Sequence, residues 1–360
     1  MFVLKVLYTK NYKYFEYNNI LEIIKKCGKM RRCKNCLIPE GFHDIKFNKD
    51  GICNLCLENK IIDNSKDKIQ CKMEFEKYIN KIRGKSEYDC LLLYSGGKDS
   101  TYLLYKLKVK YNLNVLAVTI DTGLGNPIAK KNIKKSVSVL NVDHLTITPR
   151  SGFYKKLYRF FVCHNNKKTE TCGLCQKIMH SIALNIAYEK KIPFVAQGYS
   201  PDQADEFEYS KEMLSKSWIP KELFKKPFNE YDRGYFWNPE NINYNELPRF
   251  IFPFYAIDYP GVEKIIDELS KHGLGSKRNF NPHYSNCHLV WLCMKLDIKK
   301  FNFNPYDRYF SKQIREGKTI SKFWSVILPV GSWFLKHGFI KRKEVNSALN
   351  FLNLRFEEIS

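Results

Sequence analysis

Long apolar runs are missing from this chain of 360 residues. No hydrophobic run approaches the roughly 20 residues that a membrane-spanning helix needs, so we expect no transmembrane segment. The start, Met1-Phe2-Val3-Leu4-Lys5, also lacks the basic stretch and apolar stretch that together mark a secretory signal peptide. The sequence therefore predicts a cytoplasmic protein.

Acidic residues are scarce as well, with 37 Asp and Glu against 60 Lys and Arg, for a net charge of +23. The basic residues are spread along the whole chain and form no single block. Two interpretations stay open. Scattered charge can converge on one face and bind RNA or an anionic substrate such as a nucleotide-linked sugar. It can equally be the solvated surface of a Lys-rich protein.

Cysteines are plentiful, and without an export signal their 12 thiols favour metal sites over disulfides. Four of them have the spacing C-x2-C-x16-C-x2-C, and they are Cys33, Cys36, Cys53 and Cys56. Two such pairs predict a tetrahedral Zn²⁺ site. Because four protein ligands leave no open position, we expect the zinc to be structural, within a small ribbon whose turn lies at 48–51.

The most informative feature is the motif S-G-G-K-D-S at residues 95–100. It lies between an apolar run at 90–94, typical of a buried strand, and a helical segment at 101–110. Backbone N–H groups at a helix N-terminus form an anion site, and glycines let the phosphate approach closely. The loop is too short for the Walker pattern. We expect it to hold a phosphate or pyrophosphate through Ser95, Gly96, Gly97, Lys98, Asp99, Ser100 and Thr101, the alternative being a turn that binds nothing.

Alternating strand and helix patterns surround this loop. They predict a doubly wound α/β fold with a parallel sheet and right-handed crossovers. The expected strands are 90–94, 114–120, 143–148, 194–198 and the start of 249–255; the expected helices are 71–83, 101–110, 126–140, 151–163, 171–190 and 261–271. We divide the chain into an extension at 1–29, a zinc ribbon at 30–60, an α/β domain at 70–260 and a mostly helical region at 261–360.

Ligands of such sheets bind beyond the carboxyl ends of the strands. Thr119 and Asp121 end the second predicted strand, where an adenosine would lie. Gly198 ends the fourth, and Asp202 follows it at the same crevice. A carboxylate there suits Mg²⁺ or the orientation of an acceptor. An ordinary βα turn remains the alternative for Thr119 and Asp121.

A second cysteine group consists of Cys172 and Cys175, a C-x-x-C pair at the start of a predicted helix, and the distant Cys287. A helix N-terminus lowers thiol pKa values and favours thiolates. The group suits a metal or a [4Fe-4S] cluster. Redox chemistry, a zinc site completed by His283 or His288, and simple packing are the alternatives.

The S-G-G-x-D-S pattern at 95–100 resembles the PP-loop ATP pyrophosphatases. The resemblance implies cleavage of ATP between its α and β phosphates, adenylation of a carbonyl-type oxygen, and displacement of AMP by an amine or sulfur nucleophile. Lys98 and Mg²⁺, held through Asp99 and Asp202, would neutralise charge as pyrophosphate leaves. The end of the second strand would hold the nucleotide.

Three motifs in order, the cysteine opening at 30–56, S-G-G-K-D-S and the later C-x-x-C, resemble bacterial N-acetyl sugar amidotransferases over roughly residues 30–320. That family acts in surface-polysaccharide synthesis and turns an N-acetyl group into an acetamidino group. The resemblance implies the same reaction here. Since the chain has no recognisable glutaminase domain, we expect ammonia from a separate partner.

The three-cysteine group also resembles PP-loop tRNA thiolation enzymes, in which three thiolates hold a [4Fe-4S] cluster that carries sulfur. Two positions depart from that pattern. Gln203 stands where the second acid is expected, and Met179 where a lysine is expected. A third interpretation is a zinc-ribbon protein that binds nucleic acid in a strongly salt-dependent manner, with an inactive phosphate loop.

Overall fold

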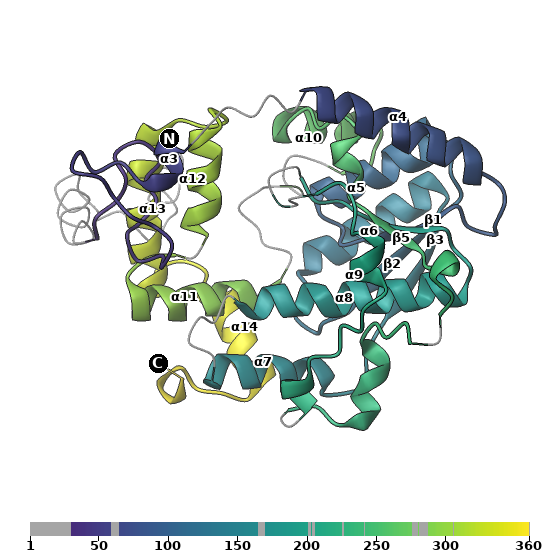
Figure 1. Cartoon of the computed structure of the whole chain (residues 1–360). Coiled ribbons are helices and arrows are strands. Elements are labelled where there is room, and N and C mark those ends of the chain that lie inside the picture. The colour runs from purple at the N-terminus through teal and green to yellow at the C-terminus, as the bar shows by residue number, and fades with distance from the viewer. Residues whose placement is uncertain are drawn as a thin grey trace. The chain divides into compact units, whose positions relative to one another are not determined.

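The computed structural model describes residues 30–58, 65–164, 170–200, 203, 206–224, 227–240, 242–275, 280, 287–304 and 306–359. The predicted extension at 1–29, Asp202 and His283 lie outside the described residues. The chain forms two compact units (Figure 1). The described residues from 65 to 288 make an α/β unit, and residues 30–58 join those after 288 in the second unit.

The α/β unit alternates strands and helices along the chain. Its strands are β1 (Cys90–Leu93), β2 (Val115–Ile120), β3 (Asp143–Ile147), β4 (Phe194–Gln197) and β5 (Arg249–Ile251). Its α-helices are α4 (Ser65–Ile82), α5 (Lys98–Tyr105), α6 (Pro127–Leu140), α7 (Phe153–His164), α8 (Glu170–Glu189), α9 (Lys211–Leu214) and α10 (Val262–Lys271). A π-helical turn, η1 (Lys106–Lys110), continues α5, and short 3₁₀ turns occur at η2 (Lys221–Phe224), η3 (Glu230–Tyr235), η4 (Tyr244–Glu246) and η5 (Pro253–Tyr255).

The five strands form one parallel sheet in the order β3-β2-β1-β4-β5. Central β1 pairs Leu92 with Ala117 on β2 and with Ala196 on β4. The chain winds outward from β1 in both directions, so the order reverses between β1 and β4. The predicted doubly wound α/β fold is confirmed, and the switch point lies where the S-G-G-K-D-S loop leaves β1.

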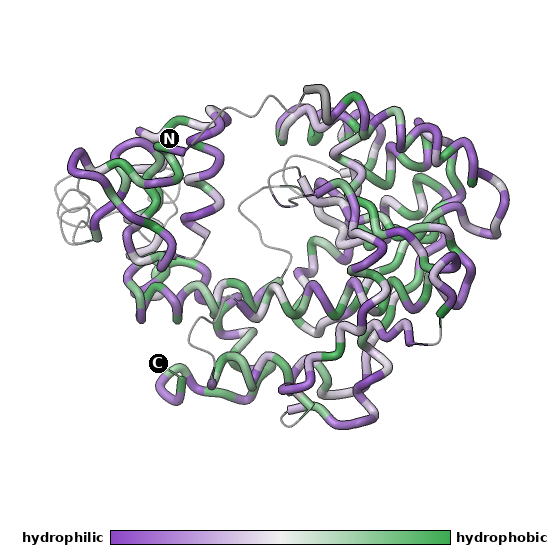
Figure 2. The backbone as a smooth tube through the Cα atoms, in the orientation of Figure 1, coloured by the Kyte–Doolittle hydropathy of each residue, from purple (hydrophilic) through white to green (hydrophobic). Residues whose placement is uncertain are grey.

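Helices cover both faces of the sheet. On one face, a core cluster joins Leu92 of β1 to Ile79 of α4, Leu103 of α5, Ile133 of α6 and Leu269 of α10, all buried. Helix α8 contacts β1 and β4, and the alternation of side chains along a strand turns Leu91 and Leu93 away from that cluster. In Figure 2 the helices change repeatedly between green and purple along their length, the alternation of an amphipathic helix between two environments.

The second unit combines the cysteine module with helices from the end of the chain. It contains the short helix α3 (Asn54–Leu57), α11 (Leu289–Phe301), α12 (Asp307–Arg315), α13 (Ser321–Lys336), α14 (Arg342–Leu352) and the turn η6 (Phe356–Glu358). Gly317 follows α12 and Gly338 follows α13, with φ values of 68° and 75°. The predicted turn of the ribbon is also present, since Gly51 N donates to Asn48 O at 3.1 Å and Phe47 pairs antiparallel with Cys53.

Among the described residues, no helix is both long enough and apolar enough to cross a bilayer.

Candidate active site

The S-G-G-K-D-S loop connects β1 directly to α5. The helix begins at Lys98, three residues earlier than the sequence predicted, with Gly97 as its N-cap. Residues 98–100 therefore form the first helical turn, whose backbone N–H groups have no partner within the helix. Gly96 has φ of +69°, a conformation that glycine adopts without strain. The turn thus places a positive helix end at the switch point of the sheet.

Close packing explains why two glycines stand around this loop. A Cβ on Gly96 would lie 2.4 Å from the Ala129 carbonyl oxygen of α6, and Asn132 donates its side-chain amide to the Gly96 carbonyl at 3.0 Å. A Cβ on Gly198, directly after β4, would lie 2.9 Å from Ser100 Cα. The loop is therefore held between α6 and the end of β4.

The predicted hydroxyl donors divide into two groups. Ser95 and Ser100 have their Oγ atoms 3.1 Å apart, and Ser100 Oγ also donates to the Gly97 carbonyl at 3.2 Å. Thr101 is fully buried, and its hydroxyl lies 3.1 Å from the buried Tyr94 hydroxyl. The two serines line the loop, whereas Thr101 anchors the helix to the core.

Lys98 and Asp99 lie next to each other and are mostly buried. Lys98 Nζ is 2.5 Å from Asp99 Oδ2, and the Tyr259 hydroxyl donates to Asp99 Oδ1 at 2.8 Å. Tyr259 comes from the segment before α10, 160 residues further along the chain. Both carboxylate oxygens of Asp99 are thus engaged by neighbours that fix its orientation.

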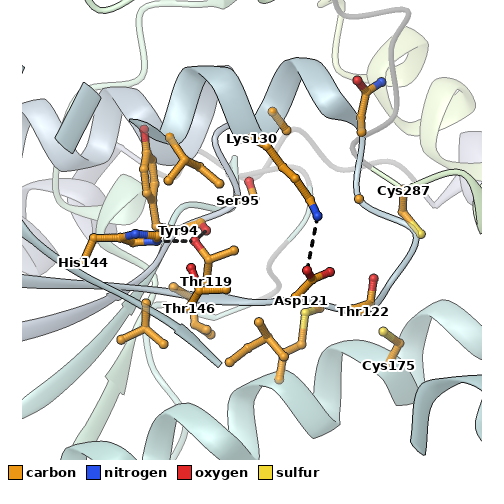
Figure 3. A pocket seen from close by; sticks show the side chains of 18 of the residues that line it. Tyr94, Ser95, Thr119, Asp121, Thr122, Lys130, His144, Thr146, Cys175 and Cys287 are labelled. Carbon is orange, nitrogen blue, oxygen red and sulfur yellow. Dashed lines mark hydrogen bonds and ion pairs between the residues drawn. The ribbon is translucent and has the colours of Figure 1, made fainter. Parts of the chain in front are cut away.

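A pocket of about 420 Å³ opens beyond the carboxyl ends of the strands, against α6 (Figure 3). Of the predicted site residues it includes Ser95 of the loop, Thr119 of β2, Asp121 directly after β2, and Cys175 and Cys287 of the second cysteine group. Residues predicted to bind the nucleotide and residues of the second cysteine group therefore line one cavity. The other predicted site residues that the structure describes in this unit are absent from its lining: Gly96, Gly97, Lys98, Asp99, Ser100, Thr101, Cys172 and Gly198.

A fixed polar network lies on the β2 side of the pocket. Thr119 Oγ1 donates to the Tyr94 carbonyl at 2.7 Å and lies 2.8 Å from His144 Nε2 on β3. Because the single Thr119 hydroxyl proton goes to the carbonyl, we assign the other hydrogen bond to His144 Nε2–H as donor. Burial lowers the pKa of His144 below its ordinary value, which keeps the ring neutral. His144 Nδ1 is then an acceptor.

Asp121 forms the mouth of the pocket with Lys130 of α6. Lys130 Nζ lies 3.2 Å from Asp121 Oδ2, the dashed pair in Figure 3, and the Gly123 backbone N–H donates to Asp121 Oδ1 at 2.9 Å. Lys130 is mostly exposed, so the ion pair itself is weak. The Lys130 ammonium group at the rim can therefore leave Asp121 and pair with an anionic ligand instead.

The sulfur atoms of Cys175 and Cys287 reach the pocket from different elements. Cys175 is in the second turn of α8; Cys287 pairs with Gly125 after β2, and the next residue donates its backbone N–H to Leu124 O at 2.9 Å. In Figure 3 both cysteines lie on the same side of the pocket as Thr122. The hairpin-like pairing explains how a residue so distant in sequence joins the site.

The expectation of a helix-stabilised thiolate is wrong for Cys175. Burial raises the pKa of its thiol, and the neighbouring Cys287 and Cys172 add to the rise, against a smaller lowering from Tyr158. The Tyr158 hydroxyl lies 3.2 Å from Cys175 Sγ. Desolvation therefore outweighs the helix end, and an unligated Cys175 stays protonated at neutral pH.

The four N-terminal cysteines fit a tetrahedral metal ion. Their Sγ atoms all lie within 4.8 Å of one another, with 3.6 Å between Cys36 and Cys53 and 3.8 Å between Cys33 and Cys56. A Zn–S bond of about 2.3 Å requires tetrahedral edges of about 3.8 Å. Burial raises the thiol pKa of Cys33, but backbone N–H groups bring it down to about 7. Within the part of the chain that the structure describes, no other group of three or more His, Cys, Asp or Glu is as close.

Comparisons with known proteins give partial similarities, and no family model matches the chain. An argininosuccinate synthase from Picrophilus torridus is 28% identical over 111 residues, 30% of this chain and 28% of that protein. An uncharacterised protein from Methanocaldococcus jannaschii is 34% identical over 129 residues, 36% of this chain and 45% of that protein. The chain thus spans less than half the length of these curated relatives.

Among solved structures, the U34-tRNA thiolase NcsA from Methanococcus maripaludis, with its [4Fe-4S] cluster, aligns with 90% of this chain and 88% of its own, at 14% identity and a TM-score of 0.36. The parallel five-stranded sheet with its flanking helices, and the loop at 95–100 between β1 and α5, fit a PP-loop-type α/β fold.

Four residues of this PP-loop site were not predicted from the sequence: Tyr158, His144, Lys130 and Tyr259. For His144 a signal existed, because it lies on the predicted strand at 143–148 and Thr119 lies on the predicted strand at 114–120. Tyr259 and Tyr158 carry no local signal, since each acts through a contact made only in the folded chain.

Proposed function

We propose that this chain uses ATP to adenylate an amide oxygen, forming pyrophosphate, and then replaces the adenylated oxygen by nitrogen. The acceptor that we propose is an N-acetyl sugar. Its amide oxygen attacks the α-phosphorus of ATP and pyrophosphate leaves. Ammonia adds to the activated carbon, and AMP departs with the original oxygen, so that C=O becomes C=NH.

One observation carries the proposal: the S-G-G-K-D-S loop forms the N-terminus of α5 at the switch point, beside the pocket at the strand ends. A pyrophosphate held by the helix end would leave the adenosine in the pocket. There His144 Nδ1 and the β2 end offer acceptors, and Lys130 offers a cation.

Each loop residue has a role in the proposed chemistry. Ser95, Ser100 and the backbone N–H groups of the first turn hold the leaving pyrophosphate. Lys98 neutralises its growing charge. The Asp99 carboxylate is a ligand type that Mg²⁺ prefers. In this structure Lys98 contacts one of its oxygens and Tyr259 contacts the other. Bound Mg²⁺ would polarise the phosphoryl oxygens.

The ammonia must come from elsewhere, and we propose a separate glutaminase as the partner. The proposal is tested first with free ammonium, which bypasses that partner. Purified protein is incubated with ATP, ammonium chloride and UDP-N-acetylglucosamine, and pyrophosphate, AMP and the sugar product are measured. Mass spectrometry identifies the product in which NH replaces O.

Lys98→Ala is expected to release pyrophosphate at least a hundredfold more slowly, because Lys98 is the one cation within the loop at 95–100. The matched control is Lys81→Ala, which removes an exposed lysine from α4. Pyrophosphate release by Lys98→Ala at the wild-type rate would overturn the adenylation. Pyrophosphate release without an amidine product would overturn the nitrogen transfer alone.

Sulfur transfer is the second candidate, favoured by Cys175 and Cys287 in the lining of the same pocket. In that case the two cysteines and Cys172 would hold a [4Fe-4S] cluster, and the acceptor would be RNA or a small molecule. Anaerobic purification followed by iron, sulfide and zinc analysis distinguishes the candidates. About four irons per chain, lost in Cys172→Ala, would favour sulfur transfer; about one zinc without iron would favour nitrogen transfer.

A further inference from the structure

A second cavity of about 360 Å³ lies on another face of α8, within the α/β unit. Helix positions 173, 176, 177 and 180 form one wall, a spacing that puts them on one side of the helix. Cys175 and Met179, on the adjoining side, line the first pocket. One helix thus separates the two cavities.

His180 is the most deeply buried polar residue that lines this second cavity. It is 4% exposed, and its Nδ1 lies 3.0 Å from the Tyr209 hydroxyl, whereas its Nε2 is buried without any hydrogen-bond partner. Leaving such a buried nitrogen unpaired is unfavourable. Burial lowers the pKa of His180 to about 3, so the ring is neutral and has one unused hydrogen-bonding valence.

Aromatic rings form the opposite wall. Tyr199 and Phe252 are stacked, with ring centroids 5.8 Å apart and an interplanar angle of 15°. Tyr209 meets Phe252 edge to face at 5.2 Å. These rings support one another and offer flat, rigid apolar surface next to hydroxyl groups, a combination that suits a ring-shaped polar ligand.

Among the residues that the structure describes, those at the rim carry both donors and acceptors and no excess of charge. Gln176, Lys177, Gln203 and Glu206 are exposed there. One cation and one carboxylate balance each other, so the rim does not favour a phosphate. Amide and carboxylate groups around an aromatic wall match a ligand that carries several hydroxyl groups, each of which both donates and accepts.

The cavity is connected to the phosphate loop through the end of β4. Tyr199 directly follows Gly198, whose backbone packs against Ser100. We propose that this cavity binds a neutral, hydroxyl-rich ring, the sugar of the acceptor, with His180 and Tyr209 at its base and Glu206 at its rim. That the bound ring belongs to the acceptor rests on the proposed function. That the ligand is a hydroxyl-rich ring rests on the lining of the cavity alone.

Isothermal titration of the full chain with N-acetylglucosamine tests the inference. Two variants change different parts of the cavity. Tyr209→Phe removes one hydroxyl beside His180 at the base, and Glu206→Gln neutralises an exposed carboxylate at the rim. Tyr78→Phe is the matched control, because it also deletes one hydroxyl, a donor to the Pro193 carbonyl, outside both cavities. Thermal melting of each variant checks that it folds.

We expect the sugar to bind at least tenfold more weakly to Tyr209→Phe and to Glu206→Gln, and within twofold of wild type to the control. Wild-type affinity in both variants would overturn the site. A chain that binds uridine but not N-acetylglucosamine through these residues would overturn the class of ligand. ATP binding by the wild-type chain is titrated separately: its absence would refute the proposed function and leave the sugar result standing.

Discussion

Arg315 Nη1 donates to Cys36 Sγ across 3.3 Å. Arg315 is the last residue of α12, and Cys36 is a fully buried member of the four-cysteine group. A divalent ion with four thiolates carries two net negative charges, and burial makes an outside donor valuable. Helix α12 thus supplies a charged hydrogen-bond donor to the four-cysteine group.

Arg315→Gln should therefore weaken metal binding by about 10–100-fold, the usual effect of removing a partner of a ligand atom. Arg308→Gln is the matched control, since Arg308 pairs with Asp44 at 2.6 Å. Competition with a chromophoric chelator measures both affinities. Equal affinities of the two variants would show that Arg315 does not support the metal site.

A second link between these segments is the ion pair of Arg32 and Asp307, 2.7 Å apart, in which Asp307 is fully buried. Arg32→Met strands that carboxylate, and we expect a loss of about 3–5 kcal/mol in the free energy of unfolding of this unit. Breaking the exposed pair with Arg308→Met should cost less than about 1 kcal/mol. Urea unfolding followed by tryptophan fluorescence compares them. The double variant Arg32→Met with Asp307→Leu should recover most of the loss, and no recovery would contradict the explanation.

Gly96→Ala should destabilise the phosphate loop because the new methyl group meets backbone. Its Cβ would lie 2.4 Å from Ala129 O, at φ of +69°. We expect a loss of about 2–5 kcal/mol, from backbone strain and overpacking together, and weaker ATP binding. Gly84→Ala has φ of +72° with nothing within 4 Å, so it isolates the strain alone, about 1–2 kcal/mol. The urea midpoints of the two variants are compared. Equal midpoints would show that the contact of the new methyl group with α6 does not contribute to the loss of stability.

Acid should destabilise the α/β unit through His180. Its pKa is about 3 in the folded chain and about 6.5 in the unfolded chain. A depressed pKa gives stability that is fully present above pH 6.5 and is lost as the pH falls toward 3, by about 1.4 kcal/mol per pH unit. His180→Phe removes the titration, so its urea midpoint should fall less between pH 7 and pH 4.5 than that of wild type. Parallel pH profiles would contradict the assignment.

The strands and the cysteine spacing were predictable because their signals are local. The apolar run before Gly96 and the two C-x2-C pairs need only a few neighbouring residues to be recognised. The start of α5 was misplaced by three residues, since Asp99 and Ser100 have weak intrinsic helix propensity and only the N-cap at Gly97 decides the boundary.

The contacts that complete the site were not predictable. Tyr259 reaches Asp99 over 160 residues, and Cys287 comes to the pocket by pairing with Gly125. Such contacts depend on the topology of the sheet and leave no periodic trace in the sequence. The same holds for the Cys175 thiol. Its position near the start of a helix could be predicted from the sequence, whereas the burial that raises its pKa could not.

The division of the chain into two units has a consequence for the order of synthesis. The cysteine module at 30–58 is made before the α/β unit, but its partners Asp307 and Arg315 are made only after that unit. The whole α/β unit, whose central strand β1 comes first and is extended on both sides, can fold in between. A nascent chain stopped at residue 288 would already contain the phosphate loop and both cavities, while its metal ligands would still lack their arginine.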